Sequence, residues 1–245
     1  MILSGIEYKD FWDNQESSYN RSESQVYLRK KADEHISLIE YKSKKTDEIL
    51  DIGCGAGELL FFVVNELNVK TAIDYSGLLL NKAKKRLRAH KEINFIKSDV
   101  FEYLSKSKEK IWMTTASVNQ YLNNSKVSQL IEKFSENKKV KYFYLFDTVD
   151  YIKYKMNICG SSYKNQSVLE KNIFKQLSKK IKCIINIVSL FMIYNKETVK
   201  LDSKVMGYGH SPQFWLFLAK KYNLEIEIVS SRYFEYRYHV ILWKK

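Results

Sequence analysis

The 245-residue chain has few of the features that mark membrane spans, disulfide frameworks and metal sites. Its three cysteines, Cys54, Cys159 and Cys183, are widely spaced and odd in number, which excludes a disulfide framework and a CxxC metal site. No apolar run approaches the ~20 residues that cross a bilayer, and residues 1–8 show no secretory signal. These absences predict a reduced, cytoplasmic protein without a metal.

Basic residues, by contrast, are abundant. Lysine and arginine number 41 against 28 acidic residues, which gives a formal net charge of +13. Such a charge permits an anionic partner, whether a nucleotide-linked substrate, a nucleic acid or a membrane surface, and selects none of them. The densest cluster, residues 82–88, is interpreted as the solvated face of a helix.

Short hydrophobic runs alternate with longer amphipathic stretches along the chain. Their β-branched and aromatic residues favour strands. The expected strands are residues 48–52, 69–74, 93–97, 111–115, 140–146, 225–229 and 238–243, and the expected helices are residues 22–41, 56–66, 77–90, 126–137 and 212–222. This alternation predicts an α/β fold with a seven-stranded, mostly parallel sheet and helices on both faces. The last two strands are joined too closely for a crossover helix, so the last strand should be antiparallel.

We expect a single domain over residues 1–245. Residues 1–45 would form a helical cover, and residues 150–210, which lack strand periodicity, an insertion after the fifth strand on the substrate side. Within the insertion, residues 167–182 are basic and amphipathic, and residues 183–194 are apolar. A buried element is the simpler interpretation of the apolar run, and contact with a membrane surface is the alternative.

The strongest local signal is a glycine-rich turn between the first strand and the following helix, Asp51-Ile-Gly53-Cys54-Gly55-Ala-Gly57. Glycine permits positive φ and close approach of a ligand, and the helix N-terminus offers free N–H groups. The dinucleotide pattern G-x-G-x-x-G fails because the third glycine comes one residue early, and no Lys-Ser/Thr pair completes a phosphate loop. The turn suits a ligand with a zwitterionic tail, whose ammonium can meet Asp51 directly or through water.

Two further acids follow the next strands. Asp74 ends the second strand about 20 residues after the turn, where a carboxylate can accept both hydroxyls of a ribose, and Tyr75 beside it offers a flat face for adenine. Asp99 ends the third strand and could accept the adenine amino group while the Val100 N–H meets a ring nitrogen. Each acid alone could equally be a helix cap. Three of them behind one glycine turn indicate a nucleoside site.

These motifs resemble those of class I S-adenosylmethionine-dependent methyltransferases. Residues 51–57 match the D-x-G-x-G-x-G loop of that family, Asp74 matches its ribose acid, and residues 98–100 match its adenine-binding segment. Residues 112–122, with Ala116, resemble the fourth motif, although the acid that usually opens it is absent. The resemblance implies a Rossmann-like fold, S-adenosyl-L-methionine as cofactor and S-adenosyl-L-homocysteine as product.

The N-terminal segment carries a further part of this resemblance. Residues 8–27, with Trp12 and Tyr19, are similar to the aromatic cover over the cofactor in small-molecule members. The alternative is hydrophobic packing of helix ends.

The methyl acceptor is less clearly indicated. Because Pro212 is the only proline, the Asp/Asn-Pro-Pro-aromatic motif of amino-methylating nucleic-acid enzymes and the Pro-Cys nucleophile of cytosine-carbon methylation are both excluded. Two short C-terminal motifs, residues 208–212 and 236–245, resemble those of small methyltransferases from surface-polysaccharide clusters. This resemblance implies transfer to an oxygen of a sugar, nucleotide-sugar or phosphate-type group. An RNA methyltransferase or basic RNA-binding protein is the alternative, and a membrane-associated scaffold around residues 183–194 is a third hypothesis.

An oxygen acceptor calls for a general base. His210, in an expected glycine-flanked loop before the helix cap Ser211, is one candidate, and Asp147 at the end of the fifth strand is the other. His35 and His90 are expected on the polar sides of helices, and His239 is expected to be structural.

Three residues are candidates for contact with the acceptor. Gln120 and Tyr121 follow the fourth strand and should face the pocket. Arg237 could meet an anionic acceptor, although a surface salt bridge is the simpler interpretation.

Overall fold

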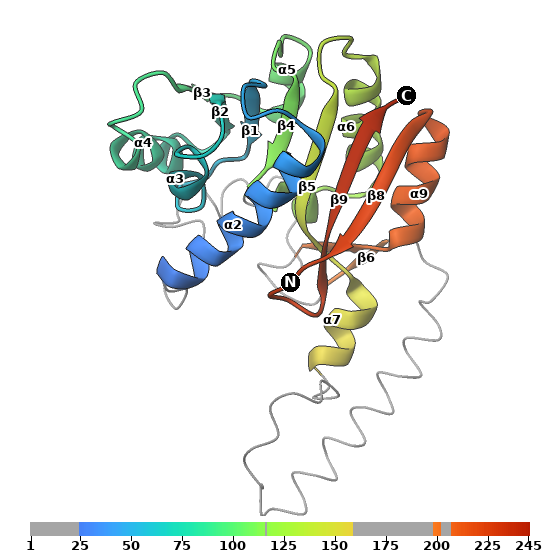
Figure 1. Ribbon diagram of the computed structural model, residues 1–245. Coiled ribbons are helices and arrows are strands. Elements are labelled where there is room, and N and C mark those ends of the chain that lie inside the picture. The colour runs from blue at the N-terminus through green and yellow to red at the C-terminus, as the bar shows by residue number, and fades with distance from the viewer. Residues whose placement is uncertain (1–24, 116, 159–197, 202–206) are drawn as a thin grey trace, which may run out of the picture.

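The computed structural model describes residues 25–115, 117–158, 198–201 and 207–245, and Figure 1 shows their arrangement. One large sheet contains the strands β1 Ile49–Ile52, β2 Val69–Asp74, β3 Asn94–Lys97, β4 Ile111–Thr114, β5 Tyr142–Val149, β8 Leu224–Ser230 and β9 Arg237–Lys244. The helical elements are α2 Gln25–Lys42, α3 Leu60–Val63, α4 Gly77–Arg86, α5 Val100–Leu104, η1 Val118–Tyr121, α6 Asn124–Glu136, α7 Tyr151–Ile158 and α9 Pro212–Lys221. A small hairpin pairs β6 Thr198–Lys200 with β7 Tyr208–His210.

The strand order confirms the predicted fold class. It is β3-β2-β1-β4-β5-β9-β8, in which β1 to β5 pair in parallel and β9 is antiparallel to both of its neighbours. The short β8–β9 connection leaves no length for a crossover, as expected. The carboxyl ends of the five parallel strands therefore lie together at one edge of the sheet.

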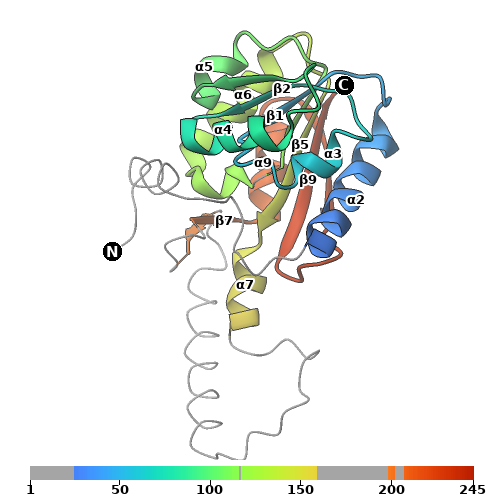
Figure 2. The ribbon, with the colours of Figure 1, turned by 90° about the vertical axis from the view of Figure 1, so that its left-hand side faces the viewer.

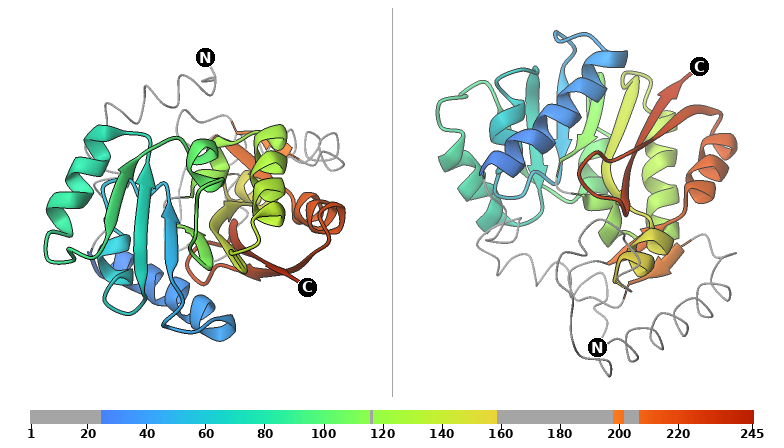
Figure 3. Two further views of the ribbon diagram at one scale, coloured as in Figure 1. Left: turned by 90° about the horizontal axis from the view of Figure 1, so that it is seen from above. Right: turned by 60° about the horizontal axis from the view of Figure 1, so that its bottom comes forward.

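Helices cover both faces of this sheet, as the views in Figures 2 and 3 show. Alternate residues of each strand supply two cores because side chains of a strand point to opposite faces in turn. Ile49 and Met113 join the core under α2, α3 and α4, whereas Leu50 and Trp112 join the core under α5, α6 and α9. The central strands are consequently buried on both sides, which explains why they read as continuous apolar runs.

Part of the predicted insertion has regular structure that its sequence did not indicate. After β5, the chain forms α7, and residues 198–200 pair with residues 208–210 as β6 and β7. The basic and apolar pieces at 167–182 and 183–194 lie outside the described residues. Within the described part, no helix combines the length and the apolar character needed to span a bilayer.

Candidate functional site

The glycine turn after β1 takes a backbone shape that requires glycine. Gly53, Gly55 and Gly57 have φ of 69°, 57° and 71°, in the left-handed region that other residues avoid. The Gly53 N–H donates to the Ile73 carbonyl oxygen at 2.8 Å, which ties the turn to β2. A Cβ on Gly53 would lie 2.1 Å from Cγ2 of Val118. The turn is therefore held between the ends of β2 and the segment after β4.

Cys54 within the turn is a buried thiol. Its Sγ lies 3.7 Å from the Gly55 carbonyl oxygen. Burial raises the pKa of Cys54 well above its usual value, and the nearby carboxylates of Asp74 and Asp51 raise it further. The thiol is therefore neutral at physiological pH, which excludes it as a nucleophile and leaves it a packing residue of the turn.

Asp51 in β1 is fully buried, and its side chain contacts the end of the neighbouring strand β4. Its two carboxylate oxygens accept from the Thr115 backbone N–H at 3.1 Å and from the Thr115 hydroxyl at 2.8 Å. Burial raises the pKa of Asp51 to about 7, although the Thr115 hydrogen bonds lower it, and the charge of Asp74 adds to the rise. Asp51 therefore changes protonation near neutral pH, beneath the glycine turn.

Asp74 ends β2 and holds the neighbouring turns. Oδ2 accepts from the Gly55 N–H and Oδ1 from the Ser76 N–H, both at 2.8 Å. The Ser76 hydroxyl caps α4 by accepting from the Leu79 N–H. The Asp74 carboxylate thus lies at the carboxyl end of β2, the position at which an acid accepts the hydroxyls of a ribose in nucleotide-binding α/β folds. Tyr75 beside it is half-buried.

Asp99 follows β3 and caps α5. Its Oδ1 accepts from the Phe101 N–H at 2.9 Å, which is the capping role considered as the alternative for each acid. Asp99 and Val100 are both half-buried at the carboxyl end of β3. The three predicted acids thus lie at the ends of β1, β2 and β3, which are adjacent in the sheet.

The predicted acceptor residues are brought together across the sheet. Gln120 in η1 donates from Nε2 to the Tyr121 hydroxyl at 2.6 Å. Arg237, at the start of β9, donates from Nη1 to the Asp147 carbonyl oxygen at 2.6 Å, to Gln120 Oε1 at 3.4 Å and to Ser117 Oγ at 3.5 Å. The half-buried guanidinium of β9 is thus held by β5 and by the segment that follows β4.

Two aromatic rings lie beside Arg237. Its guanidinium lies 5.4 Å from the ring centre of Phe234 and 5.6 Å from that of Tyr236. The aromatic faces and the uncharged oxygens fix its orientation. The sequence analysis did not predict the contact of Ser117 with Arg237. Ser117 has a φ of 56°, a conformation that depends on tertiary contacts and is not indicated by the neighbouring residues.

The expectation that His210 lies in a flexible loop is wrong. His210 ends β7 and is fully buried, with Nε2 3.2 Å from the Asn119 carbonyl oxygen and its ring stacked on Phe214 at 5.4 Å. A Cβ on Gly207 would lie 2.0 Å from the Gln120 carbonyl oxygen. The flanking glycine therefore permits close packing of the hairpin on η1, and it is not a sign of flexibility.

Burial also decides the charge of His210. It lowers the pKa of His210 to about 4, against the smaller opposing effects of the Asn119 and Leu122 carbonyl groups. The imidazole is therefore neutral at physiological pH, next to η1.

Asp147 does not face the predicted pocket. Its carboxylate is buried against α2, with Oδ2 2.6 Å from Lys31 Nζ and 3.7 Å from His35 Nε2. Burial alone would raise the pKa of Asp147, but the charge of Lys31, followed by His35, His239 and Arg237, holds that pKa well below its usual range. The expected surface position of His35 is also wrong, because its ring stacks on Phe146 at 3.8 Å and is fully buried.

His35, Asp147 and His239 resemble a metal-binding set, because one ligand atom of each lies within 4.8 Å of the others. Two contacts favour a charge cluster instead. The Asp147 N–H donates to Nδ1 of His239 at 3.2 Å, which leaves the imidazole proton on Nε2, the nitrogen that would bind the ion. Lys31 already neutralises the carboxylate.

Three predicted cofactor contacts, Trp12, Tyr19 and Ala116, lie outside the described residues. Of the predicted N-terminal cover, the described residues include α2 alone. Glu34 in α2 joins this helix to the β8–β9 turn, because its carboxylate accepts from the Arg232 N–H at 2.7 Å. The sequence analysis missed Lys31 and Glu34 because charged residues on a helix ordinarily indicate a solvated face.

Comparisons with known proteins agree with this architecture. Residues 49–139, less than half of the chain, match the family model described as "Methyltransferase domain". Magnesium protoporphyrin IX methyltransferase (ChlM) from Synechocystis PCC 6803 with bound SAM is 10% identical, with a TM-score of 0.59 and coverage of 100% of this chain and 99% of that chain. The same enzyme with bound SAH is 12% identical, with a TM-score of 0.57.

Two further solved structures show the same likeness. The methyltransferase domain of bacterial CtHen1-C is 14% identical, with a TM-score of 0.57 and coverage of 88% of this chain and 97% of that chain. An O-methyltransferase family protein from Burkholderia thailandensis is 12% identical, with a TM-score of 0.51 over 90% of this chain and 58% of that chain. A search of curated proteins finds no match. The strand order and these structures confirm the predicted Rossmann-like methyltransferase fold, and residues 49–139 match the methyltransferase-domain model.

Proposed function

We propose that this methyltransferase-domain protein transfers the methyl group of S-adenosylmethionine to an oxygen atom of a small anionic acceptor and releases S-adenosylhomocysteine. The acceptor class we propose is a sugar, a nucleotide-sugar or a phosphate-type group used in surface-polysaccharide biosynthesis. Neighbours of the same fold that hold SAM or SAH support the cofactor, and the cation at Arg237 supports the acceptor's charge.

The described residues fit this cofactor by the chemistry of their donors and acceptors. Asp74 ends β2, where a carboxylate can accept ribose hydroxyls, and Asp51 lies under the glycine turn, where a cationic amino-acid tail would stabilise its ionised form. Tyr75, Asp99 and Val100 would hold the adenine end. When bound, S-adenosylmethionine supplies an electrophilic methyl group on a sulfonium. We keep Trp12, Tyr19 and Ala116 as proposed contacts.

One observation carries the proposal for the acceptor. The guanidinium of Arg237 is fixed by the Asp147 carbonyl, Gln120 and Ser117 at the carboxyl edge of the sheet, where ligands of open α/β sheets bind. A preoriented guanidinium can donate two parallel hydrogen bonds to a carboxylate or to a phosphate. Gln120 and Tyr121 beside it can bond to hydroxyl groups of the acceptor.

His210 is better placed than Asp147 to act as the base. His210 lies against η1, which carries Gln120 and Tyr121, and its Nε2 is 3.2 Å from the Asn119 carbonyl oxygen. The Asp147 carboxylate is ion-paired with Lys31, so accepting a proton there would cost the energy of the pair. Holding the acceptor in line with the methyl group would supply much of the rate, and the base would add about 10²–10⁴-fold.

The acceptor class can be tested by a screen. Purified protein is incubated with S-adenosylmethionine and with sugar phosphates, nucleotide-sugars or transcribed RNA, and released S-adenosylhomocysteine is measured. We expect release with a phosphorylated or nucleotide-linked sugar, and a higher KM in Arg237→Gln than in the matched surface variant Arg232→Gln. Release with RNA alone would contradict the small-molecule acceptor and favour the RNA alternative.

A further inference from the structure

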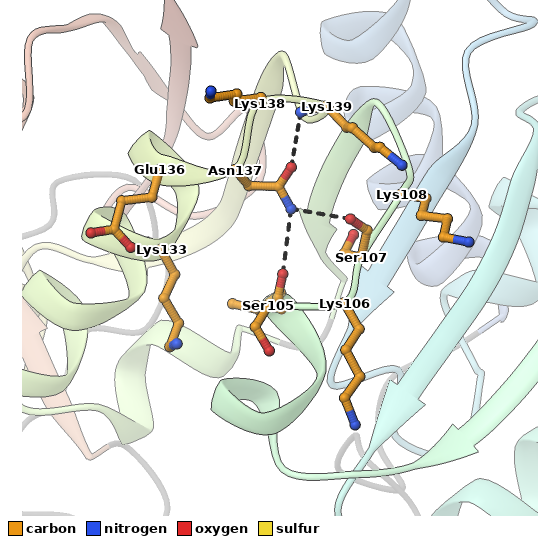
Figure 4. A pocket seen from close by; sticks show the side chains of 10 residues that line it. Ser105, Lys106, Ser107, Lys108, Lys133, Glu136, Asn137, Lys138 and Lys139 are labelled. Atoms are coloured by element: carbon orange, nitrogen blue, oxygen red, sulfur yellow. Dashed lines mark hydrogen bonds between the residues drawn. The ribbon is translucent and has the colours of Figure 1, made fainter.

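A basic hollow lies at the edge of the sheet opposite the candidate active site. It has a volume of about 510 Å³ and is formed by the α5–β4 and α6–β5 connections, as Figure 4 shows. Its charged lining consists of five lysines and one carboxylate: Lys106, Lys108, Lys133, Lys138, Lys139 and Glu136. These connections precede β4 and β5, so they lie at the amino ends of the strands, away from the glycine turn.

The polar side chains of Asn137 and Ser107 in the hollow are already hydrogen-bonded within the protein. The Asn137 amide donates to the carbonyl oxygens of Leu104 at 3.4 Å and Ser107 at 3.1 Å, and its Oδ1 accepts from the Lys139 N–H at 2.9 Å. The Ser107 hydroxyl donates to Glu109 Oε2 at 2.7 Å. What the hollow offers a ligand is therefore positive charge rather than a set of directed hydrogen bonds.

The charge is not neutralised by neighbouring acids. Within the described residues, none of the five lysines forms an ion pair with a carboxylate, whereas Lys110 at the same edge pairs with Asp47 at 3.1 Å. Lys141, which is exposed at the start of β5, extends the positive edge further. We refer to the five lysines of the hollow and Lys141 as the basic edge.

We propose that the basic edge docks the protein on the anionic lipid head groups of a membrane surface. Clusters of four to eight basic residues bind such surfaces, and each lysine near the surface contributes roughly a factor of five in affinity. Docking there would leave the opposite edge, with Arg237 and the glycine turn, open to acceptors in solution. This inference does not depend on the identity of the acceptor.

The composition of the basic edge favours lipid over nucleic acid. All its cations are lysines, which act as hydrated point charges, whereas arginine predominates where phosphates are recognised by bidentate bonds. The lining residues of the hollow include no aromatic side chain, so the hollow lacks a platform on which unpaired bases could stack.

Vesicle sedimentation tests the proposal on the full chain. We expect binding to vesicles of phosphatidylcholine with 30% phosphatidylglycerol, weak binding to phosphatidylcholine alone, and a strong loss as NaCl is raised from roughly 50 to 300 mM. The variant Lys133→Glu/Lys138→Glu/Lys139→Glu should lose about 100-fold in affinity for the anionic vesicles.

A matched variant separates the basic edge from net charge. Lys30→Glu/Lys126→Glu/Arg232→Glu makes the same charge change at exposed positions towards the carboxyl edge of the sheet, and it should retain most of the binding. Both variants should bind S-adenosylhomocysteine like wild type, which verifies folding. Equal losses in the two variants, equal binding to neutral and anionic vesicles, or tight binding of single-stranded RNA at the basic edge without vesicle binding would each overturn the proposal.

Discussion

Three buried or nearly buried carboxylates at one sheet differ in what surrounds them, and the surroundings decide the chemistry of each. Asp51 has uncharged donors from Thr115, so burial dominates and its pKa rises to about 7. Asp147 has the ammonium of Lys31, so its pKa falls. Asp74 receives two backbone N–H groups. Residue type alone therefore predicted these carboxylates but not the opposite pKa shifts of Asp51 and Asp147.

Asp51 should make cofactor affinity depend on pH. If its carboxylate meets the cationic tail, binding favours the ionised form, so affinity should rise as pH increases towards and through 7. Between pH 5.5 and 6.5, more than one unit below the pKa of an α-amino group, we expect the Kd for S-adenosylhomocysteine to fall about eightfold. Asp51→Asn should flatten this profile in calorimetric titrations. A steep profile retained in the variant would show that another group is responsible.

His210 should cost stability in acid. Its pKa is about 4 in the folded protein and near 6.5 when unfolded, so between these values the unfolded state binds more protons and stability falls as the pH is lowered. Relative to wild type, His210→Gln should gain about 3 kcal/mol in unfolding free energy between pH 7 and pH 4. Denaturant titrations at the two pH values measure this difference, in which the opposite contribution of Asp51 cancels. Parallel pH profiles would contradict a buried neutral imidazole.

At the scale of elements, the parts predicted correctly are those with local signals. The strands of the sheet, the Ser211 cap and the glycine turn all follow from neighbouring residues. The β6–β7 hairpin, α7 and the inward face of α2 did not, because their stability comes from residues distant in sequence. Lys31 and His35, for example, are buried only because Asp147 on β5 lies opposite them.

Helix α2 should depend on its buried ion pair. The side chains of Lys31 and Asp147 are 5% and 1% exposed, so Lys31→Met leaves a buried charge and should cost about 3–5 kcal/mol of stability. The double variant Lys31→Met/Asp147→Asn should be less destabilised than the sum of the single variants. Lys30→Met, at an exposed neighbouring position, serves as the control. Additive single effects in denaturant titrations would mean that the pair does not hold α2.

The glycine turn should tolerate no side chain at its first position. Gly53→Ala places a Cβ 2.1 Å from Val118 Cγ2 at a φ of 69°, and we expect a loss of about 2–4 kcal/mol in unfolding free energy together with weaker cofactor binding. Val118→Ala should restore part of the stability by removing the clash but not the backbone strain. Gly77→Ala, in the first turn of α4, should be neutral or slightly stabilising. Equal effects of the two glycine substitutions would contradict this account.

At the scale of the molecule, two edges of one sheet have separate properties. The carboxyl edge gathers the acids, the glycine turn and Arg237, and the amino edge gathers lysines around a hollow. Sequence reasoning predicted the first edge, because each strand ends in a recognisable motif. It did not predict the second, because the lysines are scattered along the chain and only the sheet topology brings them together.

The central claim is that the turn at Gly53 and the carboxylate of Asp74 hold S-adenosylmethionine. Isothermal titration of the full chain with S-adenosylhomocysteine, and separately with NAD, tests this most directly. We predict one site for S-adenosylhomocysteine and none for NAD. Asp74→Ala should weaken binding about 5–150-fold, equivalent to about 1–3 kcal/mol for lost charged hydrogen bonds, and the exposed control Asp33→Ala should bind like wild type. Absence of S-adenosylhomocysteine binding, or saturable binding of NAD at this site, would contradict the account.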